Sequence, residues 1–161
     1  MIVNYEDLPQ IREDYPDKTV VFTGGVFDLV HEGHVSGMQY CKSKGDLLVV
    51  GVSSDERVRQ RKGLGRPVRK ELGRLILVDA LKPVDYAFIM PTSNNVDSPT
   101  IQVIKTLRPN IFMDHEENKQ RWINSMSTIQ DLGTELIFNI SYRTDSSTSI
   151  IERILKSNQE V

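Results

Sequence analysis

The sequence predicts a single α/β domain with a five-stranded, mostly parallel sheet and helices on both faces. The first observation is that short apolar, β-rich runs alternate with segments whose apolar residues recur at helical spacing. The second is length, because 161 residues suffice for one domain with a proper core and no linker or internal repeat divides the chain. Strands that alternate with helices form parallel sheets through right-handed crossovers, which cover both faces.

Composition and charge limit the classes of function. Apolar residues make up 39% and charged residues 26% of the chain, proportions typical of a soluble globular protein. The formal net charge of −2 gives no broad basic field, so no nucleic-acid partner is expected. The single cysteine, Cys41, excludes an internal disulfide and suits a reducing compartment. No apolar run approaches the ~20 residues of a membrane helix, and the polar start does not resemble a signal peptide. We therefore expect a cytoplasmic protein without a membrane partner.

Each predicted strand is a short apolar run bounded by polar or turn-forming residues. Five such runs occur, at residues 19–22, 47–52, 86–89, 111–113 and 136–140. Apolar residues elsewhere return every three or four positions, which predicts amphipathic helices. These helical stripes are Val35, Met38 and Cys41; Leu72, Leu75, Ile76 and Ala80; Ile101, Ile104 and Leu107; Trp122, Ile123, Met126 and Ile129; and Ile150, Ile151, Ile154 and Leu155.

The first strand is preceded by a predicted short helix at residues 5–13. Residues 1–18 are therefore an N-terminal extension, and residues 19–155 are the core of a Rossmann-like domain that takes up the whole chain. In such sheets, ligands bind at the carboxyl ends of the strands, where the strand order reverses. Two longer connections, residues 62–69 and 91–99, are predicted to be loops that line or cover a site there.

The most informative run, residues 23–34, follows the first predicted strand directly. Gly24 and Gly25 let the backbone approach a ligand closely, and the next helix offers free N–H groups and the positive end of its dipole. His31 and His34 lie where this helix starts, and imidazole N–H donors there can stabilise the negative charge of a phosphoryl transition state. The run therefore predicts a phosphate-handling site.

Simpler interpretations exist for the same residues. One histidine could cap the helix while the other is an ordinary polar residue, and Asp28 could equally cap the turn. Two histidines at this spacing could in principle bind a metal, but no carboxylate or cysteine pattern completes a ligand set, so no protein-bound metal is predicted. The register of Gly25, Asp28 and Gly33 with the histidines favours phosphate handling.

A basic segment, residues 57–70, carries seven Lys or Arg in fourteen residues on a slightly acidic chain. Its glycines indicate a mobile loop that closes over a triphosphate and shields the pyrophosphate leaving group. Lys62 is the first candidate for this role and Arg61 the second. The alternative is a solvated charged surface.

A further candidate anion site, residues 142–149, lies between the last strand and the last helix. Ser147 or Thr148 is expected to cap that helix. Their hydroxyls, with Arg143 nearby, can also donate to phosphate oxygens.

Three other residues have competing interpretations. His115 follows the fourth strand, so it either contacts an acceptor or lies in solvent. Cys41 lies on an apolar stripe and is predicted to be a core residue rather than a nucleophile. Trp122 begins an apolar helical face and is predicted to serve packing.

The motifs resemble those of the cytidylyltransferase-like nucleotidyltransferases, whose hallmark is an HxGH element. The matching residues are Gly25-x-Phe27-Asp28-x-x-His31-x-Gly33-His34. Residues 44–52, 54–55, 62–68 and 84–85 are similar to the adenylyltransferase domain of bacterial ADP-heptose synthesis. The final motif resembles a signature shared with glycerol-3-phosphate cytidylyltransferase and consists of Arg143-Thr144 and Ser147-Thr148-Ser149. Together the similarity covers about residues 19–155.

The resemblance implies transfer of a nucleoside monophosphate from ATP or CTP to a small phosphorylated acceptor, with release of pyrophosphate and with Mg²⁺ accompanying the triphosphate. By position, it implies that His31, His34 and Lys62 are catalytic. It implies acceptor contacts from Arg74, Asp114 and His115. The implied nucleotide-binding residues are Gly24, Gly25, Val26, Phe27, Asp28, Gly33, Asp55, Arg61, Arg143, Thr144, Ser147 and Thr148.

The chain also departs from the family pattern. Residues 113–116 read Met-Asp-His-Glu where the family usually carries a glycine, and Asp145-Ser146 replace a glycine–isoleucine pair. The leading expectation is adenylylation of a heptose-type sugar 1-phosphate. The alternatives are cytidylylation of glycerol 3-phosphate or a similar polyol phosphate, adenylylation of FMN as by an FAD synthase, and a nucleotide-binding regulator without turnover. Because relatives often dimerise, a homodimer is expected.

Overall fold

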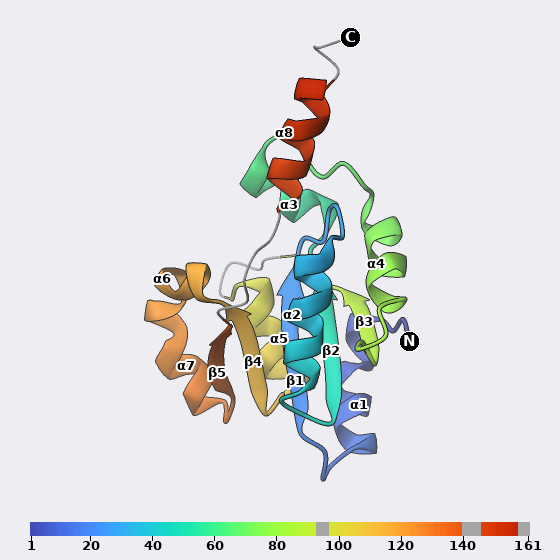
Figure 1. Ribbon diagram of the computed structural model, residues 1–161. Coiled ribbons are helices and arrows are strands. Elements are labelled where there is room, and N and C mark those ends of the chain that lie inside the picture. Colours follow the sequence, from blue (N-terminus) through green and yellow to red (C-terminus); the bar gives the residue numbers. More distant parts are fainter. Residues whose placement is uncertain (93–96, 140–145, 158–161) are drawn as a thin grey trace.

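The computed structural model describes residues 1–92, 97–139 and 146–157. Five strands form one sheet in the order β3-β2-β1-β4-β5, and every neighbouring pair is parallel (Figure 1). The strands are β1 (Val20–Gly25), β2 (Leu47–Val52), β3 (Tyr86–Ile89), β4 (Ile111–His115) and β5 (Glu135–Asn139). The predicted α/β fold is confirmed, and its sheet is parallel throughout.

The strand order reverses at β1, which lies between β2 and β4. Such a reversal opens a crevice at the carboxyl ends of the strands. β1 is longer than predicted, because its pairing with β2 continues until Gly25 lies beside Val52. Gly24 and Gly25 therefore end the strand, and the residues after them enter the crevice.

Helices cover both faces of the sheet, and each face has its own apolar core (Figure 1). Leu8, Phe22 and Ile104 are fully buried in the first core, which involves α1, α5, α6 and α7. Val50 and Val78 are fully buried in the second, which involves α2 and α4. The helices are α1 (Leu8–Asp14), α2 (Glu32–Lys42), α3 (Asp55–Lys62), α4 (Glu71–Asp79), α5 (Pro99–Leu107), α6 (Lys119–Trp122), α7 (Met126–Asp131) and α8 (Ser147–Ser157), with 3₁₀ turns at Tyr5–Asp7, Glu116–Asn118 and Ile123–Ser125.

The basic segment differs from its prediction, because its first part is helical. Residues up to Lys62 form α3, and only residues 63–70 form a connection. Ser54 caps α3 by accepting a hydrogen bond from the backbone N–H of Arg57. Acidic residues in the first turn and basic residues in the last turn suit the helix dipole, so this charge pattern favours a helix.

Two predicted helical stripes also need correction. The stripe over residues 122–129 is divided into α6, a 3₁₀ turn and α7, and Ile123 within it is 51% exposed. α8 forms as predicted, but none of its described residues is buried, and Ile154 and Leu155 are more than half exposed. Figure 1 shows α8 standing away from the sheet. None of the helices described in residues 1–157 is long and apolar enough to cross a membrane.

Candidate active site

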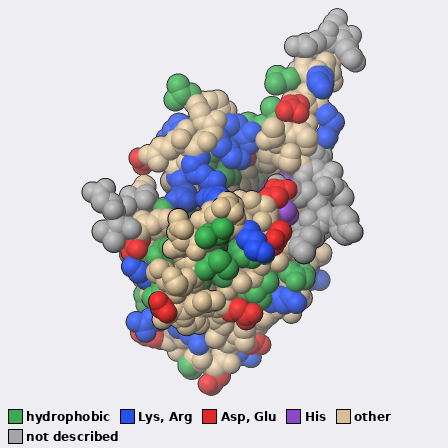
Figure 2. Space-filling model, turned by 90° about the vertical axis from the view of Figure 1, so that its left-hand side faces the viewer, with side chains coloured by type: hydrophobic (Ala, Val, Ile, Leu, Met, Phe, Trp, Pro, Cys, Tyr) green, Lys and Arg blue, Asp and Glu red, His purple; other side chains and the backbone are tan. Residues whose placement is uncertain are grey.

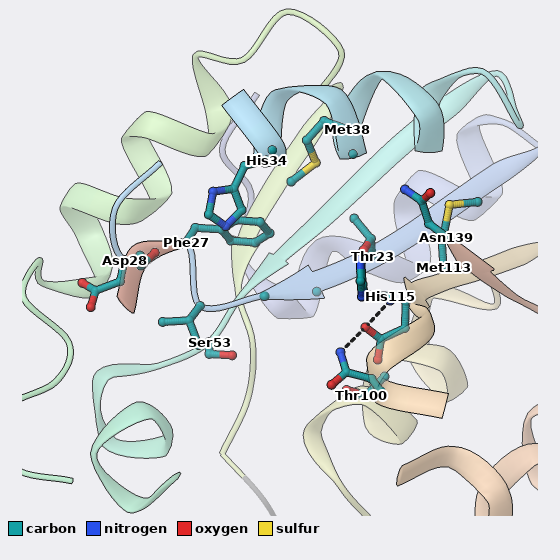
Figure 3. Close-up of a pocket in the computed structure, with 18 of the residues that line it drawn as sticks. Thr23, Phe27, Asp28, His34, Met38, Ser53, Thr100, Met113, His115 and Asn139 are labelled. Carbon is teal, nitrogen blue, oxygen red and sulfur yellow. Dashed lines mark hydrogen bonds between the residues drawn. The ribbon is translucent and has the colours of Figure 1, made fainter. Parts of the chain in front are cut away.

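A cavity of about 370 Å³ lies at the carboxyl ends of the strands, beside the reversal in strand order. Figure 3 shows Phe27 and His34 on one side of it and Thr100, His115 and Asn139 on the other. Fourteen of the predicted site residues line this cavity: Gly24, Gly25, Val26, Phe27, Asp28, His31, Gly33, His34, Arg61, Lys62, Asp114, His115, Ser147 and Thr148. The fold thus brings three separate sequence motifs to one place.

The two histidines, here called the histidine pair, are fixed by the first turn of α2. His31 is the N-cap residue, and its Nδ1 accepts a hydrogen bond from the backbone N–H of Gly33 at 3.2 Å. The Nδ1 of His34 accepts in turn from the backbone N–H of His31 at 3.3 Å. A neutral imidazole whose Nδ1 accepts carries its proton on Nε2, so each ring presents an Nε2–H donor. The capping and phosphate-handling interpretations are therefore compatible.

Phe27 explains why a glycine precedes the motif. Its backbone is left-handed, with a φ of 53°, and its ring lies edge-on to His34 at 5.3 Å between centroids. A Cβ at Gly25 would come within 2.7 Å of the Phe27 ring, and one at Gly24 within 3.1 Å of Met90 Sδ. Protein side chains therefore fill the space beside Gly24 and Gly25, where the sequence predicts the close approach of a ligand.

Asp28 joins the histidine motif to the connection after α3. Its side chain is buried and accepts from Arg66 Nε at 2.6 Å and from the backbone N–H of Arg69 at 3.0 Å. Burial opposes ionisation of Asp28, but hydrogen bonds from the Arg69 and Val68 backbone and from Arg66 outweigh it and hold the pKa of this carboxyl below its usual range. Asp28 therefore anchors residues 66–69 beside the cavity.

Arg74 and Asp55 do not line the cavity. Arg74 has no exposed surface, and its Nη2 donates to Asp55 Oδ1 at 2.8 Å and to the Ser53 carbonyl at 2.7 Å. Its other donors bind the carbonyls of Val26 and Arg69. Protein partners thus use the hydrogen-bond donors of Arg74. It positions the surrounding loops and does not contact an acceptor in the cavity.

The positive wall of the cavity is larger than the sequence indicated. Arg57 and Arg61 lie one turn apart on α3, and Arg121 of α6 joins them in the cavity lining. We call these three residues the arginine cluster. Burial and then the charges of Arg61 and Arg121 lower the pKa of Arg57; burial and Arg121 lower that of Arg61, against a smaller opposing effect of Asp114. The only sequence signal for Arg121 was a pair of cations shortly after the fourth strand.

Asp114 and His115 end β4 and face the cavity. Asp114 accepts hydrogen bonds from the backbone N–H of His115 at 2.7 Å, from Asn118 Nδ2 at 2.7 Å and from Trp122 Nε1 at 2.6 Å. Trp122, predicted to serve packing alone, thus also orients a carboxylate. His115 Nδ1 accepts from the Glu117 backbone N–H, while its Nε2 is buried and finds no hydrogen-bond partner within residues 1–92, 97–139 and 146–157.

The start of α8 completes the lining. Ser146, not Ser147 or Thr148, caps the helix, because its Oγ accepts from the backbone N–H of Ser149 at 3.1 Å. Ser147 Oγ donates to the Leu29 carbonyl at 3.2 Å, which ties α8 to the histidine motif. The predicted residues Arg143 and Thr144 lie outside the described residues.

Cys41 has no role as a nucleophile. It is buried, and its Sγ lies 3.3 Å from Met113 Sδ. Burial raises the pKa of the Cys41 thiol to about 12, so the thiol stays protonated near neutral pH. This agrees with its predicted place in the core.

Comparison with known proteins gives matches over almost the whole core. A family model described as cytidylyltransferase-like matches residues 22–153. The bifunctional protein HldE of Syntrophotalea carbinolica is 36% identical over 164 residues, covering 95% of this chain and 32% of that protein. HldE of Campylobacter fetus is 41% identical over 112 residues, covering 70% of this chain and 23% of that protein. The chain thus spans about a third or less of the length of these relatives.

Solved structures give the same picture. A lipopolysaccharide core biosynthesis protein from Thermoplasma volcanium superposes with a TM-score of 0.65 at 29% identity, covering 78% of this chain and 98% of that one. Pantothenate synthetase from Thermus thermophilus superposes with a TM-score of 0.61 at 14% identity, over 86% of this chain and 61% of that one, which is a likeness of fold alone.

Proposed function

The chain belongs to the cytidylyltransferase-like family of nucleotidyltransferases, and from this premise we propose that it transfers the AMP group of ATP to a heptose-type sugar 1-phosphate. The observation that carries the proposal is that one cavity is lined both by the histidine pair and by the basic residues of α3. Matching segments 44–52 and 62–68, which resemble the adenylyltransferase domain of ADP-heptose synthesis, support ATP and the heptose acceptor.

The proposed reaction is a direct displacement at the α-phosphorus of ATP. An oxygen of the acceptor phosphate forms a bond to the α-phosphorus, the bond to the bridging β-oxygen breaks, and pyrophosphate leaves with the electron pair. The attacking phosphate is already an anion, so no general base is needed. The Nε2–H donors of His31 and His34 stabilise the charge that develops in the transition state, and Lys62 stabilises the leaving pyrophosphate.

The described residues favour Mg²⁺ that arrives with the nucleotide. They contain no group of three or more His, Cys, Asp or Glu side chains that could hold a metal ion. Mg²⁺ in such sites is bound mainly by substrate phosphates and water with one or two carboxylates, and Asp114 is a carboxylate in this cavity. When bound, the ion would neutralise phosphate charge, while the protein side chains orient the reacting groups.

Pyrophosphate release tests the proposal. The protein is incubated with Mg²⁺ and either ATP or CTP, and with heptose 1-phosphates, glycerol 3-phosphate or FMN as acceptors. We expect release with ATP and a heptose 1-phosphate, and a nucleotide-sugar product by mass spectrometry. Release only with CTP and glycerol 3-phosphate, or only with ATP and FMN, would select the corresponding alternative. Nucleotide binding without release from any acceptor would support a regulator.

Two further expectations extend this proposal. A cytoplasmic location follows from the need for ATP and from a single buried thiol without a disulfide partner. A homodimer stays a prediction, which sedimentation analysis at several protein concentrations would test.

A further inference from the structure

We propose that the arginine cluster is a second anion subsite, which holds the attacking phosphate of the acceptor in the cavity that the histidine pair also lines. Arg57, Arg61 and Arg121 would bind this phosphate, and Arg121 would be a specificity-determining residue for phosphorylated acceptors. The inference rests on the proposed function and assigns a place in the cavity to its second substrate.

The cluster is assembled from two distant segments. Arg57 and Arg61 come from one face of α3, and Arg121 comes from α6, after β4. The short helix α6 is held at the cavity by the hydrogen bond from Trp122 Nε1 to Asp114, and Arg121 Nη1 also donates to Asn118 Oδ1 at 3.3 Å. Figure 2 shows Lys and Arg side chains gathered along the hollow in this face of the molecule.

The arginine cluster concentrates positive charge in the cavity lining. Among the described residues, no carboxylate forms an ion pair with Arg57, Arg61 or Arg121. Arg57 Nε is buried and has no hydrogen-bond partner in the part of the chain that the structure describes. Guanidinium groups brought together without a counter-ion repel one another and lose hydration, whereas a bound phosphate dianion would accept their hydrogen bonds. The arrangement therefore fits an anionic ligand.

The neighbourhood of the cluster separates it from the triphosphate site. In the proposed reaction the triphosphate has donors of its own in the histidine pair and in Thr148 at the start of α8, all of which line the cavity. The cluster instead adjoins Asp114, whose charge is felt by Arg61. A fixed carboxylate accepts hydrogen bonds from sugar hydroxyls, which the triphosphate chain itself does not offer. Cations beside an oriented carboxylate thus match a phosphorylated polyol.

The proposed subsite has a chemical purpose in the displacement. An attacking phosphate held by Arg57 and Arg121 keeps one oxygen directed at the α-phosphorus, which the histidine pair holds from the other side. Two like-charged substrates can then occupy one cavity, because each has its own set of cations.

Substitution of Arg121 tests the subsite, with Lys119→Gln as the matched control. Both residues lie on α6, and each substitution removes one positive charge. Lys119, however, forms an ion pair with Glu116 at 3.4 Å and does not line the cavity. We expect Arg121→Gln to raise the KM for the sugar 1-phosphate by about 10- to 100-fold, the loss expected for charge-assisted hydrogen bonds, with a change below about twofold in the KM for ATP. Lys119→Gln should change neither.

Arg57→Gln provides a second variant on the other helix and should give the same pattern. Far-ultraviolet circular dichroism and thermal unfolding would confirm that each variant is folded. A raised KM for ATP with an unchanged KM for the acceptor would overturn the inference, because the cluster would then bind the triphosphate. Unchanged values for both substrates would overturn it as well.

Inorganic phosphate distinguishes failure of this inference from failure of the proposed function. In calorimetric titrations without nucleotide, we expect phosphate to bind the wild type and the Lys119→Gln variant equally well. Its affinity for the Arg121→Gln variant should be at least about tenfold lower. That result would support the subsite even if no tested acceptor releases pyrophosphate. Equal phosphate affinity in all three proteins would overturn the subsite and leave the proposed reaction standing.

Discussion

The two sides of the cavity are built in different ways. The histidine pair comes from one short run, in which His34 Nδ1 accepts from the backbone N–H of His31 and His31 Nδ1 accepts from that of Gly33, within a single helical turn. The arginine cluster comes from two helices separated by two strands in the sequence, and only the fold brings Arg121 to α3. The first side is encoded locally, whereas the second depends on how β4 ends.

This difference has a physical consequence for substitutions. A change in the histidine pair should alter chemistry with little effect on folding, because the helix start is held by its own backbone. Changes near the basic side should alter both binding and the anchoring of residues 63–70, which depends on Asp28 and Arg74. The following variants test this contrast, from the largest expected effect to the smallest.

His34→Ala should have the largest effect on turnover. Loss of a preorganised donor costs about 2.7–4 kcal/mol of transition-state stabilisation, which is about 10²- to 10³-fold in kcat. The melting temperature should change little, because α2 keeps His31 as its cap. Steady-state kinetics and thermal unfolding of the same preparation measure both quantities. Turnover close to that of the wild type would remove His34 from the mechanism.

Asp28→Asn should destabilise the protein as well as slow it. The substitution weakens charge-assisted hydrogen bonds to Arg66 and leaves that guanidinium without its buried counter-ion, at a cost of about 1.5–3 kcal/mol of unfolding free energy. Denaturant titrations at pH 7 measure this cost, with Asp46→Asn as an exposed carboxylate control. A loss in activity without loss in stability would contradict the anchoring role.

The same variant should alter the dependence of stability on pH. The pKa of Asp28 is held below its usual value of 3.8, so its contribution is complete above that value and is lost as the pH falls through the lower folded value. We expect the wild type to lose stability below about pH 4 more steeply than Asp28→Asn. Denaturant titrations of both proteins at a series of acidic pH values measure this difference. Equal loss of unfolding free energy in the two proteins would contradict the role of the Asp28 carboxylate.

Lys62→Ala should reduce kcat by about tenfold, equivalent to about 1.4 kcal/mol, because one cation facing the leaving group is lost. Its effect on the melting temperature should be smaller, since the end of α3 contributes little to the core. Lys70→Ala is the matched control, because it removes the same charge outside the cavity lining. Equal losses of rate and stability in Lys62→Ala would contradict this assignment.

Leu155→Ser should have the smallest effect. The side chain is 59% exposed, so its substitution should change the unfolding free energy by less than about 0.5 kcal/mol. Ile104→Ser, in the first core, is the contrasting variant and should be strongly destabilising. A marked loss of stability in Leu155→Ser would show that α8 is covered in solution.

The sequence was most informative where function and structure use neighbouring residues. Five apolar runs and the helical stripes between them predicted the sheet, because burial against two faces leaves a strong periodic signal. The run from Gly24 to His34 predicted the position of the cavity because the strand end, the turn and the helix start follow one another directly in the sequence.

Residues whose roles depend on distant partners leave no local signal in the sequence. The family resemblance suggested a ligand contact for Arg74, yet its partners come from two other segments, Val26 after β1 and Ser53 and Asp55 after β2, and Arg74 is buried among them. Arg121 carries the same charge as Arg74, but it lies on the short helix α6 and lines the cavity. Charge alone does not distinguish these outcomes, because the topology decides which guanidinium is buried.

The bond between Trp122 and Asp114 gives the protein an optical reporter of its own. Trp122 is the only tryptophan in the chain, it lines the cavity, and its indole packs edge-on against Phe112 at 5.1 Å between ring centroids. Indole emission responds to the polarity and charge around the ring nitrogen, which here donates to the Asp114 carboxylate. Intrinsic fluorescence can therefore follow occupancy of this end of the cavity in real time, without a label.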